Sequence, residues 1–258
     1  MHDILYLTDI FKQNIINLKI SVKYKMSIIT NVYQTEIEIF IHPFSEVVSN
    51  EIRSKKTFFE FPFLDFCKIN YPLHGGGVID IGANIGNHSL FYASFLNCSV
   101  VHAFEPHPDN LQILHKNLCR FEGKCIIYDY ALSNSEGSMT LYNSQKENYG
   151  GFSLHSYSNG SSFVIKDSIP VKTLDSFGLT NISMIKIDVE NHENEVLEGA
   201  RNTIQNNKPI IFVENLYHGF PNVQPDPNIH CKIMKEFGYK KIASNLLDLY
   251  MDLWVPDE

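Results

Sequence analysis

Carboxylates and glycines stand where short apolar runs of this sequence end. The segment Asp80-Ile-Gly82-Ala-Asn84-Ile-Gly86 follows one such run, and Glu105 follows the next, 25 residues after Asp80 (105 − 80). Glycine allows a backbone to approach a ligand without a clashing Cβ atom. A carboxylate at a strand end accepts hydrogen bonds from the hydroxyls of a ribose. The spacing therefore predicts a site for an adenosine-containing molecule.

The charge at the start of this motif selects among adenosine cofactors. A dinucleotide-binding turn has the pattern G-x-G-x-x-G, but Asp80 stands where its first glycine would be. A carboxylate repels a pyrophosphate and attracts the ammonium group of a methionine moiety. We therefore expect S-adenosylmethionine rather than a nicotinamide cofactor.

Two neighbouring positions are expected to complete the cofactor site. Asn87 and His88 begin a helix, whose free N–H groups and dipole favour a carboxylate such as that of methionine. Asp129-Tyr130-Ala131 ends the third strand, where backbone and side chains can bracket an adenine ring. The complete predicted set is Asp80, Gly82, Asn84, Gly86, Asn87, His88, Glu105, Asp129, Tyr130 and Ala131.

Oxygen-bearing side chains also follow the fourth and fifth strands, at Asp188 and at Glu214-Asn215. Two carboxylates and an amide oxygen suit a hard cation such as Mg²⁺ or Mn²⁺. Such an ion would lower the pKa of an acceptor hydroxyl and hold it in line with a methyl group. The alternative is that Asp188 is a structural carboxylate on the cofactor side, while Glu214 and Asn215 position the substrate by hydrogen bonds.

The proton of that hydroxyl requires a base. Glu190 and His192 follow Asp188 within one turn, so either can reach the same pocket. An imidazole titrates near neutrality, which suits a general base, although a single histidine is more often structural. The candidate catalytic residues are therefore His192, Asp188 and Glu190.

The elements that must position these residues alternate along the chain, because short apolar runs are separated by helical patterns. This order is typical of a doubly wound α/β fold with a mostly parallel seven-stranded sheet. The short connection around Ser244-Asn245 predicts a hairpin and hence an antiparallel strand. The expected strands are 78–81, 99–104, 125–128, 184–187, 210–213, 239–243 and 247–254, with helices at 89–95, 108–118, 193–205 and 230–237.

The remaining segments are less regular. Residues 132–182 form a stretch too long for a bare loop, so small strands or a flap are expected there. Residues 1–75 are interpreted as an N-terminal extension or cap on a methyltransferase domain at 76–258. The extension either packs on the core or contributes to substrate binding or a dimer contact. The loops 148–155 and 217–222 are expected to cover the acceptor, with Tyr149 and His218 among their contacts.

Charge and composition exclude several classes of function. The net charge is −8, with 21 Lys and Arg against 29 Asp and Glu, which disfavours a nucleic-acid partner. No run approaches the roughly 20 apolar residues of a membrane span, and the start lacks a secretory cleavage pattern, so a cytoplasmic location is expected. The five cysteines are scattered and odd in number, which disfavours a disulfide framework or zinc site. A homo-oligomer remains open.

An ordered series of motifs resembles the FkbM family of methyltransferases. The resemblance covers about residues 76–216 and implies the Rossmann-like class I methyltransferase fold and O-methylation of a sugar, polyketide or similar natural product, with a nucleotide-linked or surface-glycan sugar as the first choice. One departure is Asn191, where the family usually has glycine. Its side chain either narrows the acceptor pocket or requires a left-handed backbone, which asparagine tolerates. The matching stretches are 78–88, 103–106, 131–133 with 136–137, 171–175, 185–190, 192–193, 196–197, 199–200 and 209–214.

Three interpretations of the function are open at this point. The first is an O-methyltransferase that acts on a sugar with the assistance of a divalent metal. The second is a metal-independent methyltransferase of a polyketide, lipid or amine. The third is a non-catalytic S-adenosylmethionine-binding module, which the carboxylates Asp188, Glu190 and Glu214 speak against, since a binding protein has no need of them.

Overall fold

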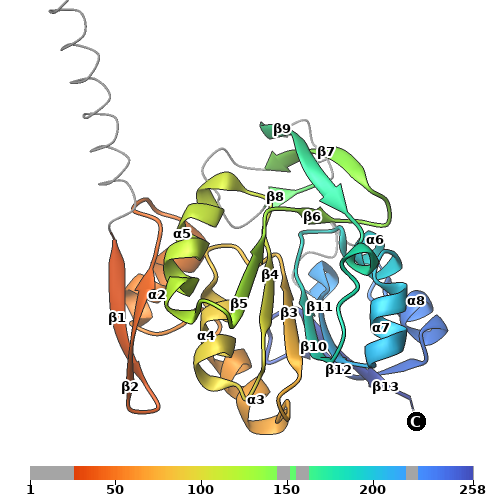
Figure 1. Cartoon of the computed structure of the whole chain (residues 1–258), viewed down its shortest axis with the longest axis horizontal. Helices are drawn as coiled ribbons and strands as arrows, with labels where there is room; N and C mark the ends of the chain where they lie inside the picture. The colour runs from red at the N-terminus through yellow and green to blue at the C-terminus, as the bar shows by residue number, and fades with distance from the viewer. Residues whose placement is uncertain (1–25, 144–151, 155–162, 219–225, 258) are drawn as a thin grey trace, which may run out of the picture.

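Seven strands form the central sheet of the computed structural model, which describes residues 26–143, 152–154, 163–218 and 226–257 (Figure 1). Their order is β12-β13-β11-β10-β3-β4-β5, and β13 alone runs antiparallel to its neighbours. This confirms the mostly parallel, doubly wound sheet and the late hairpin. The strands are β3 (Gly77–Ile81), β4 (Val101–Phe104), β5 (Cys125–Tyr128), β10 (Ile182–Ile187), β11 (Ile210–Glu214), β12 (Tyr239–Leu246) and β13 (Met251–Pro256).

Consecutive residues of a strand point to opposite faces of the sheet, so both faces carry apolar side chains. Helices cover both of these faces. Val78 packs with α3, α4 and α5 in one hydrophobic cluster, whereas Ile79 and Ile81 pack with α6, α7 and α8 in another. β3 lies between β4 and β10, so the chain changes direction at this point of the sheet, where open α/β sheets bind ligands. The helices are α3 (Phe61–Asn70), α4 (Asn87–Phe95), α5 (Pro108–Leu118), α6 (Glu193–Glu198), α7 (Arg201–Asn207) and α8 (Cys231–Glu236), with short 3₁₀ turns η1 (Cys119–Phe121), η2 (Leu174–Phe177) and η3 (Leu216–His218).

The expected helix 193–205 is wrong as a single element, because it is divided into α6 and α7 at Gly199 and Ala200. A Cβ atom on Gly199 would lie 2.0 Å from the carbonyl oxygen of Ser133. The chain therefore places its glycine where another segment packs directly against the backbone. The hairpin turn is also displaced, since β12 continues to Leu246 and the turn falls at 247–250 rather than at 244–245.

The irregular stretch 132–182 contains the small strands that its length predicts. A second sheet has the order β6-β9-β7-β8 and lies above one edge of the main sheet (Figure 1). Its own core contains Leu141, Ile169 and Val171. Its strands are β6 (Ala131–Leu132), β7 (Gly137–Asn143), β8 (Phe152–Ser153) and β9 (Phe163–Lys172).

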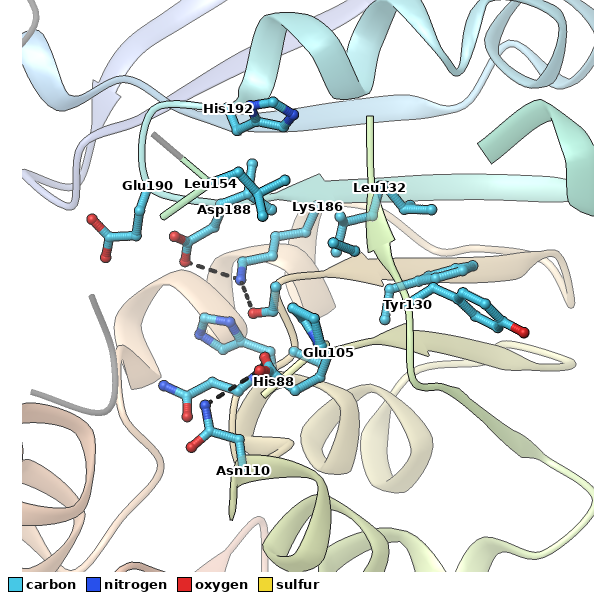
Figure 2. A pocket seen from close by; sticks show the side chains of 18 of the residues that line it. His88, Glu105, Asn110, Tyr130, Leu132, Leu154, Lys186, Asp188, Glu190 and His192 are labelled. Atoms are coloured by element: carbon cyan, nitrogen blue, oxygen red, sulfur yellow. Dashed lines mark hydrogen bonds and ion pairs between the residues drawn. The ribbon is translucent and has the colours of Figure 1, made fainter. Parts of the chain in front are cut away.

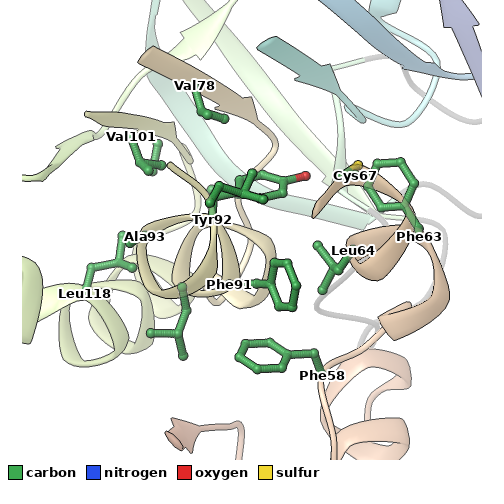
Figure 3. Close-up of a cluster of buried hydrophobic side chains, with 14 of the residues drawn as sticks. Phe58, Phe63, Leu64, Cys67, Val78, Phe91, Tyr92, Ala93, Val101 and Leu118 are labelled. Carbon is green, nitrogen blue, oxygen red and sulfur yellow. The ribbon is translucent and has the colours of Figure 1, made fainter. Parts of the chain in front are cut away.

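The described part of the N-terminal segment packs on the face covered by α4. It forms a hairpin of β1 (Ser27–Val32) and β2 (Thr35–Phe40), then α2 (Val47–Lys55) and α3. Phe58, Phe63 and Leu64 join Phe91 and Tyr92 of α4 in one buried cluster (Figure 3). The N-terminal segment therefore shares one hydrophobic cluster with the main domain.

A buried asparagine joins this segment to the main domain. Asn117 of α5 accepts a hydrogen bond from the Phe40 backbone N–H at 2.7 Å and donates to the carbonyl oxygens of Phe40 and Ile85 at 2.9 and 2.7 Å. Its side chain thus holds β2 against the turn that follows β3.

No helix within the described ranges is long and apolar enough to cross a membrane. All five cysteines are free; Cys67 and Cys98 are buried as expected of small apolar residues, whereas Cys119 is exposed.

Replacing Asn117 with alanine should destabilise the protein. The change removes three hydrogen bonds, one to the buried Ile85 carbonyl oxygen and two to the half-buried backbone of Phe40. An unsatisfied buried group costs about 1–3 kcal/mol, so the free energy of unfolding should fall by at least about 1 kcal/mol. Chemical denaturation measures this. Asn134, which is exposed and bonds only to Glu198 in the described structure, provides the matched control, and its alanine variant should stay within about 0.5 kcal/mol of the parent. Equal stability of both variants would contradict the assignment.

Candidate functional site

A cavity opens at the carboxyl ends of β3, β4 and β10, and the small sheet forms part of its wall (Figure 2). Its volume is about 850 Å³ including the open mouth. The catalytic candidates Asp188, Glu190 and His192 also line it. Of the predicted cofactor residues, it is lined by Gly82, Asn84, Asn87, His88, Glu105, Tyr130 and Ala131, and not by Asp80, Gly86 or Asp129.

The glycine turn after β3 is required by packing within the protein as well as by ligand access. Gly82 and Gly86 have φ angles of +76° and +83°, which favour glycine. A Cβ atom on Gly82 would lie 1.8 Å from the carbonyl oxygen of Asp188, and one on Gly86 would lie 2.5 Å from Leu114. The first glycine therefore allows the ends of β3 and β10 to approach closely.

The most prominent residue that sequence reasoning missed is Lys186. Its side chain is 2% exposed, and its Nζ lies 3.0 Å from Asp188 Oδ2, 3.6 Å from Asp80 Oδ1 and 3.3 Å from the Gly82 carbonyl oxygen. Burial alone would lower the pKa of Lys186, but the two carboxylates hold it above its usual value. The ammonium group is therefore charged. The available signal was a lysine inside the apolar run Met184-Ile-Lys-Ile187.

Lys186 changes the interpretation of Asp80. This carboxylate is fully buried, pairs with Lys186 and accepts a hydrogen bond of 2.6 Å from Ser89 Oγ. Because Asp80 does not line the cavity, the described geometry gives it an internal cation as partner in place of the ammonium group of a methionine moiety. Asp80 thus contributes to the site through Lys186.

Glu105 ends β4 with its carboxylate fixed in the cavity wall. It accepts hydrogen bonds from the backbone N–H groups of Asn84 and His107, both at 2.8 Å, and from Asn110 Nδ2 at 3.4 Å. A carboxylate has about four acceptor positions, so capacity remains for a ligand hydroxyl. Burial raises the pKa of Glu105 to about 7, although these donors and Lys186 lower it.

Helix α4 begins beside the cavity and is held there by the N-terminal segment. Asn87 accepts from the Phe59 backbone N–H and donates to the Phe59 carbonyl oxygen, both at 3.0 Å. His88 Nε2 lies 3.2 Å from Glu60 Oε2. The N-cap residue, Gly86, has no side chain to cap the first turn, so backbone N–H groups at the start of α4 can face an anion in the cavity. Val48 and Phe59 also line the cavity.

The residues that follow β5 supply an aromatic wall of the cavity. Tyr130 lines the cavity, with Phe177 5.9 Å from its ring centroid and Lys172 Nζ over its ring at 5.6 Å. Ala131 and Leu132 continue this wall. Asp129 is exposed and lies outside it.

The turn after β10 carries the predicted catalytic residues in an unusual backbone conformation. Glu190 and Asn191 have φ angles of +56° and +74°, so the left-handed conformation expected of Asn191 is confirmed. Ser153 Oγ donates to the Glu190 carbonyl oxygen at 2.6 Å, and Glu193 Oε1 accepts from the Val189 N–H at 3.1 Å. The turn is thus held from β8 and from α6.

Carboxylates concentrate on this side of the cavity. Burial and the charges of Asp188 and Glu193 raise the pKa of Glu190 to about 8. Burial, opposed by hydrogen bonds, raises the pKa of Glu193 to about 7. Burial is the largest cause that raises the pKa of Glu214 well above its usual value. The negative charges of Asp188, Glu190 and Glu193 raise it further.

The other two catalytic candidates have partners inside the protein. His192 is 2% exposed; its Nε2 lies 2.9 Å from Ser133 Oγ and its Nδ1 lies 3.7 Å from Glu195 Oε2. Asp188 is held by Lys186. Glu190 is half-buried, and Figure 2 shows its carboxylate directed away from Lys186.

The three predicted metal ligands do not form a cation site in the described geometry. Lys186 places an ammonium group 3.0 Å from Asp188, where it opposes a second cation. Asn215 donates to Pro227 and Asp252 and accepts from the Tyr217 N–H, so its amide is already engaged. Glu214 does not line the cavity. Among the residues with assigned positions, no group of three His, Cys, Asp or Glu side chains could hold a metal ion.

The two loops expected to cover the acceptor are described only in part. Leu154 lines the cavity. Tyr217 and His218 form η3 and lie outside the lining, where His218 Nε2 contacts Asp252 Oδ1 at 2.9 Å. Tyr149, His155 and residues 219–222 lie outside the described residues.

Comparisons with known proteins identify a family for this chain. A family model described as the Methyltransferase FkbM domain matches residues 80–241. The chain is 35% identical over 126 residues to the hexuronic acid methyltransferase AglP of Haloferax volcanii, and the match spans 49% of this chain and half (50%) of that protein's length. It is also similar to the crystal structure of Methyltransferase FkbM from Methylobacillus flagellatus, with 18% identity and a TM-score of 0.49, covering 70% of this chain and 43% of that one.

Replacing Lys186 with methionine should leave Asp80 as a buried charge without its cation. Breaking a buried ion pair costs about 3–5 kcal/mol, so the free energy of unfolding at pH 7 should fall by about that amount in chemical denaturation. Adding Asp80→Asn should restore part of the loss, because it removes the uncompensated charge. Lys55→Met removes an exposed pair with Glu51 and should change stability by less than about 1 kcal/mol. A Lys186→Met protein as stable as the parent would overturn this interpretation.

Proposed function

The chain belongs to the FkbM methyltransferase family, and from this premise we propose that it transfers the methyl group of S-adenosylmethionine to a hydroxyl group of a sugar. The observation that carries the proposal is a single cavity that joins Glu105 and the first turn of α4 to Asp188 and Glu190. The sugar is proposed because the relative from Haloferax volcanii bears the name hexuronic acid methyltransferase. We also propose that residues 1–75 form an N-terminal extension and residues 76–258 the methyltransferase domain.

The residues of the cavity fit this cofactor at three points. Glu105 would accept hydrogen bonds from the ribose hydroxyls, and Tyr130 and Leu132 would enclose the adenine ring. The free N–H groups that begin α4 would bind the carboxylate of the methionine moiety. When bound, S-adenosylmethionine supplies an electrophilic methyl group. The chain itself orients the two reactants and removes a proton.

Glu190 is the residue best suited to accept the proton of the acceptor. A general base works best when its pKa lies near the pH of the reaction, and burial beside Asp188 raises the pKa of Glu190 to about 8. Its carboxylate would take the hydroxyl proton as the oxygen forms its bond to the methyl carbon. Asp188, held by Lys186, and His192, held by Ser133, would shape this side of the cavity as positioning residues.

The described geometry favours a reaction without a bound metal. The positive charge of Lys186 already lies between Asp80 and Asp188, and the Asn215 amide is engaged elsewhere. We therefore propose that the protein methylates a sugar, as in the first interpretation from the sequence, but does so without a metal, as in the second.

Replacing Glu190 with glutamine should lower turnover by about 10²- to 10⁴-fold, the usual contribution of a general base. The base must be ionised, so kcat/KM of the parent should rise with pH through about 8 and then level off. The variant should lose this dependence. Glu198→Gln, at an exposed position of α6, provides the control with parental kinetics. A parental rate and pH profile for Glu190→Gln would exclude Glu190 as the base.

Removal of divalent metals should leave the activity intact. The purified protein is dialysed against EDTA and incubated with methyl-labelled S-adenosylmethionine and a panel of acceptors. The panel contains nucleotide sugars and glycans, including hexuronic acids, together with representative polyketides, lipids and amines. We expect label in a sugar of this panel, with and without chelator. Activity that disappears with EDTA and returns with Mg²⁺ or Mn²⁺ would contradict the metal-free mechanism. Label that enters only a polyketide, lipid or amine would contradict the sugar acceptor.

A further inference from the structure

A buried chain of hydrogen bonds connects the N-terminal segment to Glu105. His42, which follows β2, places its Nε2 2.9 Å from Asn110 Oδ1. Asn110, near the start of α5, places its Nδ2 3.4 Å from Glu105 Oε1 (Figure 2). His42 and Asn110 are 0% and 1% exposed. The three side chains come from three separate segments and form one continuous polar path in the interior.

The chemistry of the two ends fixes the direction of every bond in this path. An ionised carboxylate only accepts hydrogen bonds, so Asn110 must present its amide N–H to Glu105. Its oxygen then faces His42, and His42 must donate from Nε2. Removing one partner would leave a buried polar group without its hydrogen bond, which destabilises the protein. Each side chain of the path therefore holds its neighbour in a defined orientation.

His42 is itself held rigidly by the N-terminal segment. Its backbone N–H donates to Ser49 Oγ and its carbonyl oxygen accepts from Arg53 Nη2, both at 3.0 Å. Its ring stacks on Phe44 with centroids 4.7 Å apart. Ser49 and Arg53 belong to α2, so the position of the imidazole depends on the packing of that helix.

We propose that His42 and Asn110 are positioning residues for the cofactor: His42 holds Asn110, and Asn110 holds Glu105 in the orientation that accepts the ribose hydroxyls. The proposal rests on the proposed placement of the ribose at Glu105. On this proposal, residues 26–75 contribute to the cofactor site in two ways. Helix α2 holds His42 in place, and Val48 and Phe59 form part of the cavity wall.

The ionisation of Glu105 provides a readout that a merely structural role would not change. Burial raises its pKa to about 7 in the free protein, while Asn110 and Lys186 lower it. Ribose hydroxyls favour the ionised form, so cofactor binding should weaken as the pH falls below about 7 and should be constant above it. Loss of the Asn110 donor should move this transition to higher pH. The titratable groups facing Glu105 are Lys186 from β10, His107 beside it and His42 beyond Asn110.

A matched pair of substitutions at His42 tests the proposal. His42→Phe keeps a ring but removes the donor, whereas His42→Gln keeps a side-chain N–H that can reach Asn110. Calorimetry with S-adenosylhomocysteine from pH 6 to pH 9 should show binding weakened about three- to tenfold in His42→Phe, with the transition at higher pH. His42→Gln should restore most of both. Asn110→Ala, which removes the donor to Glu105 directly, should reproduce the His42→Phe result.

The outcomes separate this inference from the proposed function. If Glu105→Ala binds S-adenosylhomocysteine as tightly as the parent, the placement of the ribose is wrong. If Glu105→Ala weakens binding while His42→Phe and Asn110→Ala show parental affinity and pH dependence, the placement stands and the positioning role is overturned. The same holds if His42→Gln behaves as His42→Phe does.

Discussion

One buried ammonium group determines how the two central strands of this protein can meet. Lys186 lies between Asp80 of β3 and Asp188 at the end of β10. Lys186 and Asp80 are both buried, and buried charges are tolerated only when they are paired with good geometry. This pairing requires a close approach of the strand ends, which in turn requires a residue without a Cβ atom at Gly82. The glycine turn, the direction of Asp188 and the floor of the cavity all depend on this contact.

Two additional segments complete the cavity from opposite sides. The N-terminal segment contributes Val48 and Phe59, and the small sheet contributes Leu141 and Leu154. Each is fixed by polar contacts to the main domain, such as the clamp of Asn87 on Phe59 and the bond from Ser153 to the turn at Glu190. The doubly wound sheet thus supplies the position of the site, while the inserted and preceding segments supply part of its walls.

Local patterns in the sequence were sufficient for most elements and for one side of the site. Apolar runs and turn glycines place β3, β4, β10 and β11, and the position of Glu105 follows from the end of β4. The partners of polar side chains could not be predicted, because they are set by distant segments: Asp80 binds Lys186, and Asn215 binds Asp252, 37 residues away. The metal hypothesis for Asp188, Glu214 and Asn215 rested on strand ends alone. It did not include Lys186, two residues before Asp188, although a lysine inside an apolar run is visible in the sequence.

A crystal structure of the complex with S-adenosylhomocysteine is the most direct test of this arrangement. The ribose hydroxyls should bind the Glu105 carboxylate, the ligand carboxylate should lie at the start of α4, and the sulfur should face Glu190, with Lys186 still between Asp80 and Asp188. A ligand bound away from Glu105, or a cation joining Asp188 to Glu214 with Lys186 displaced, would contradict it.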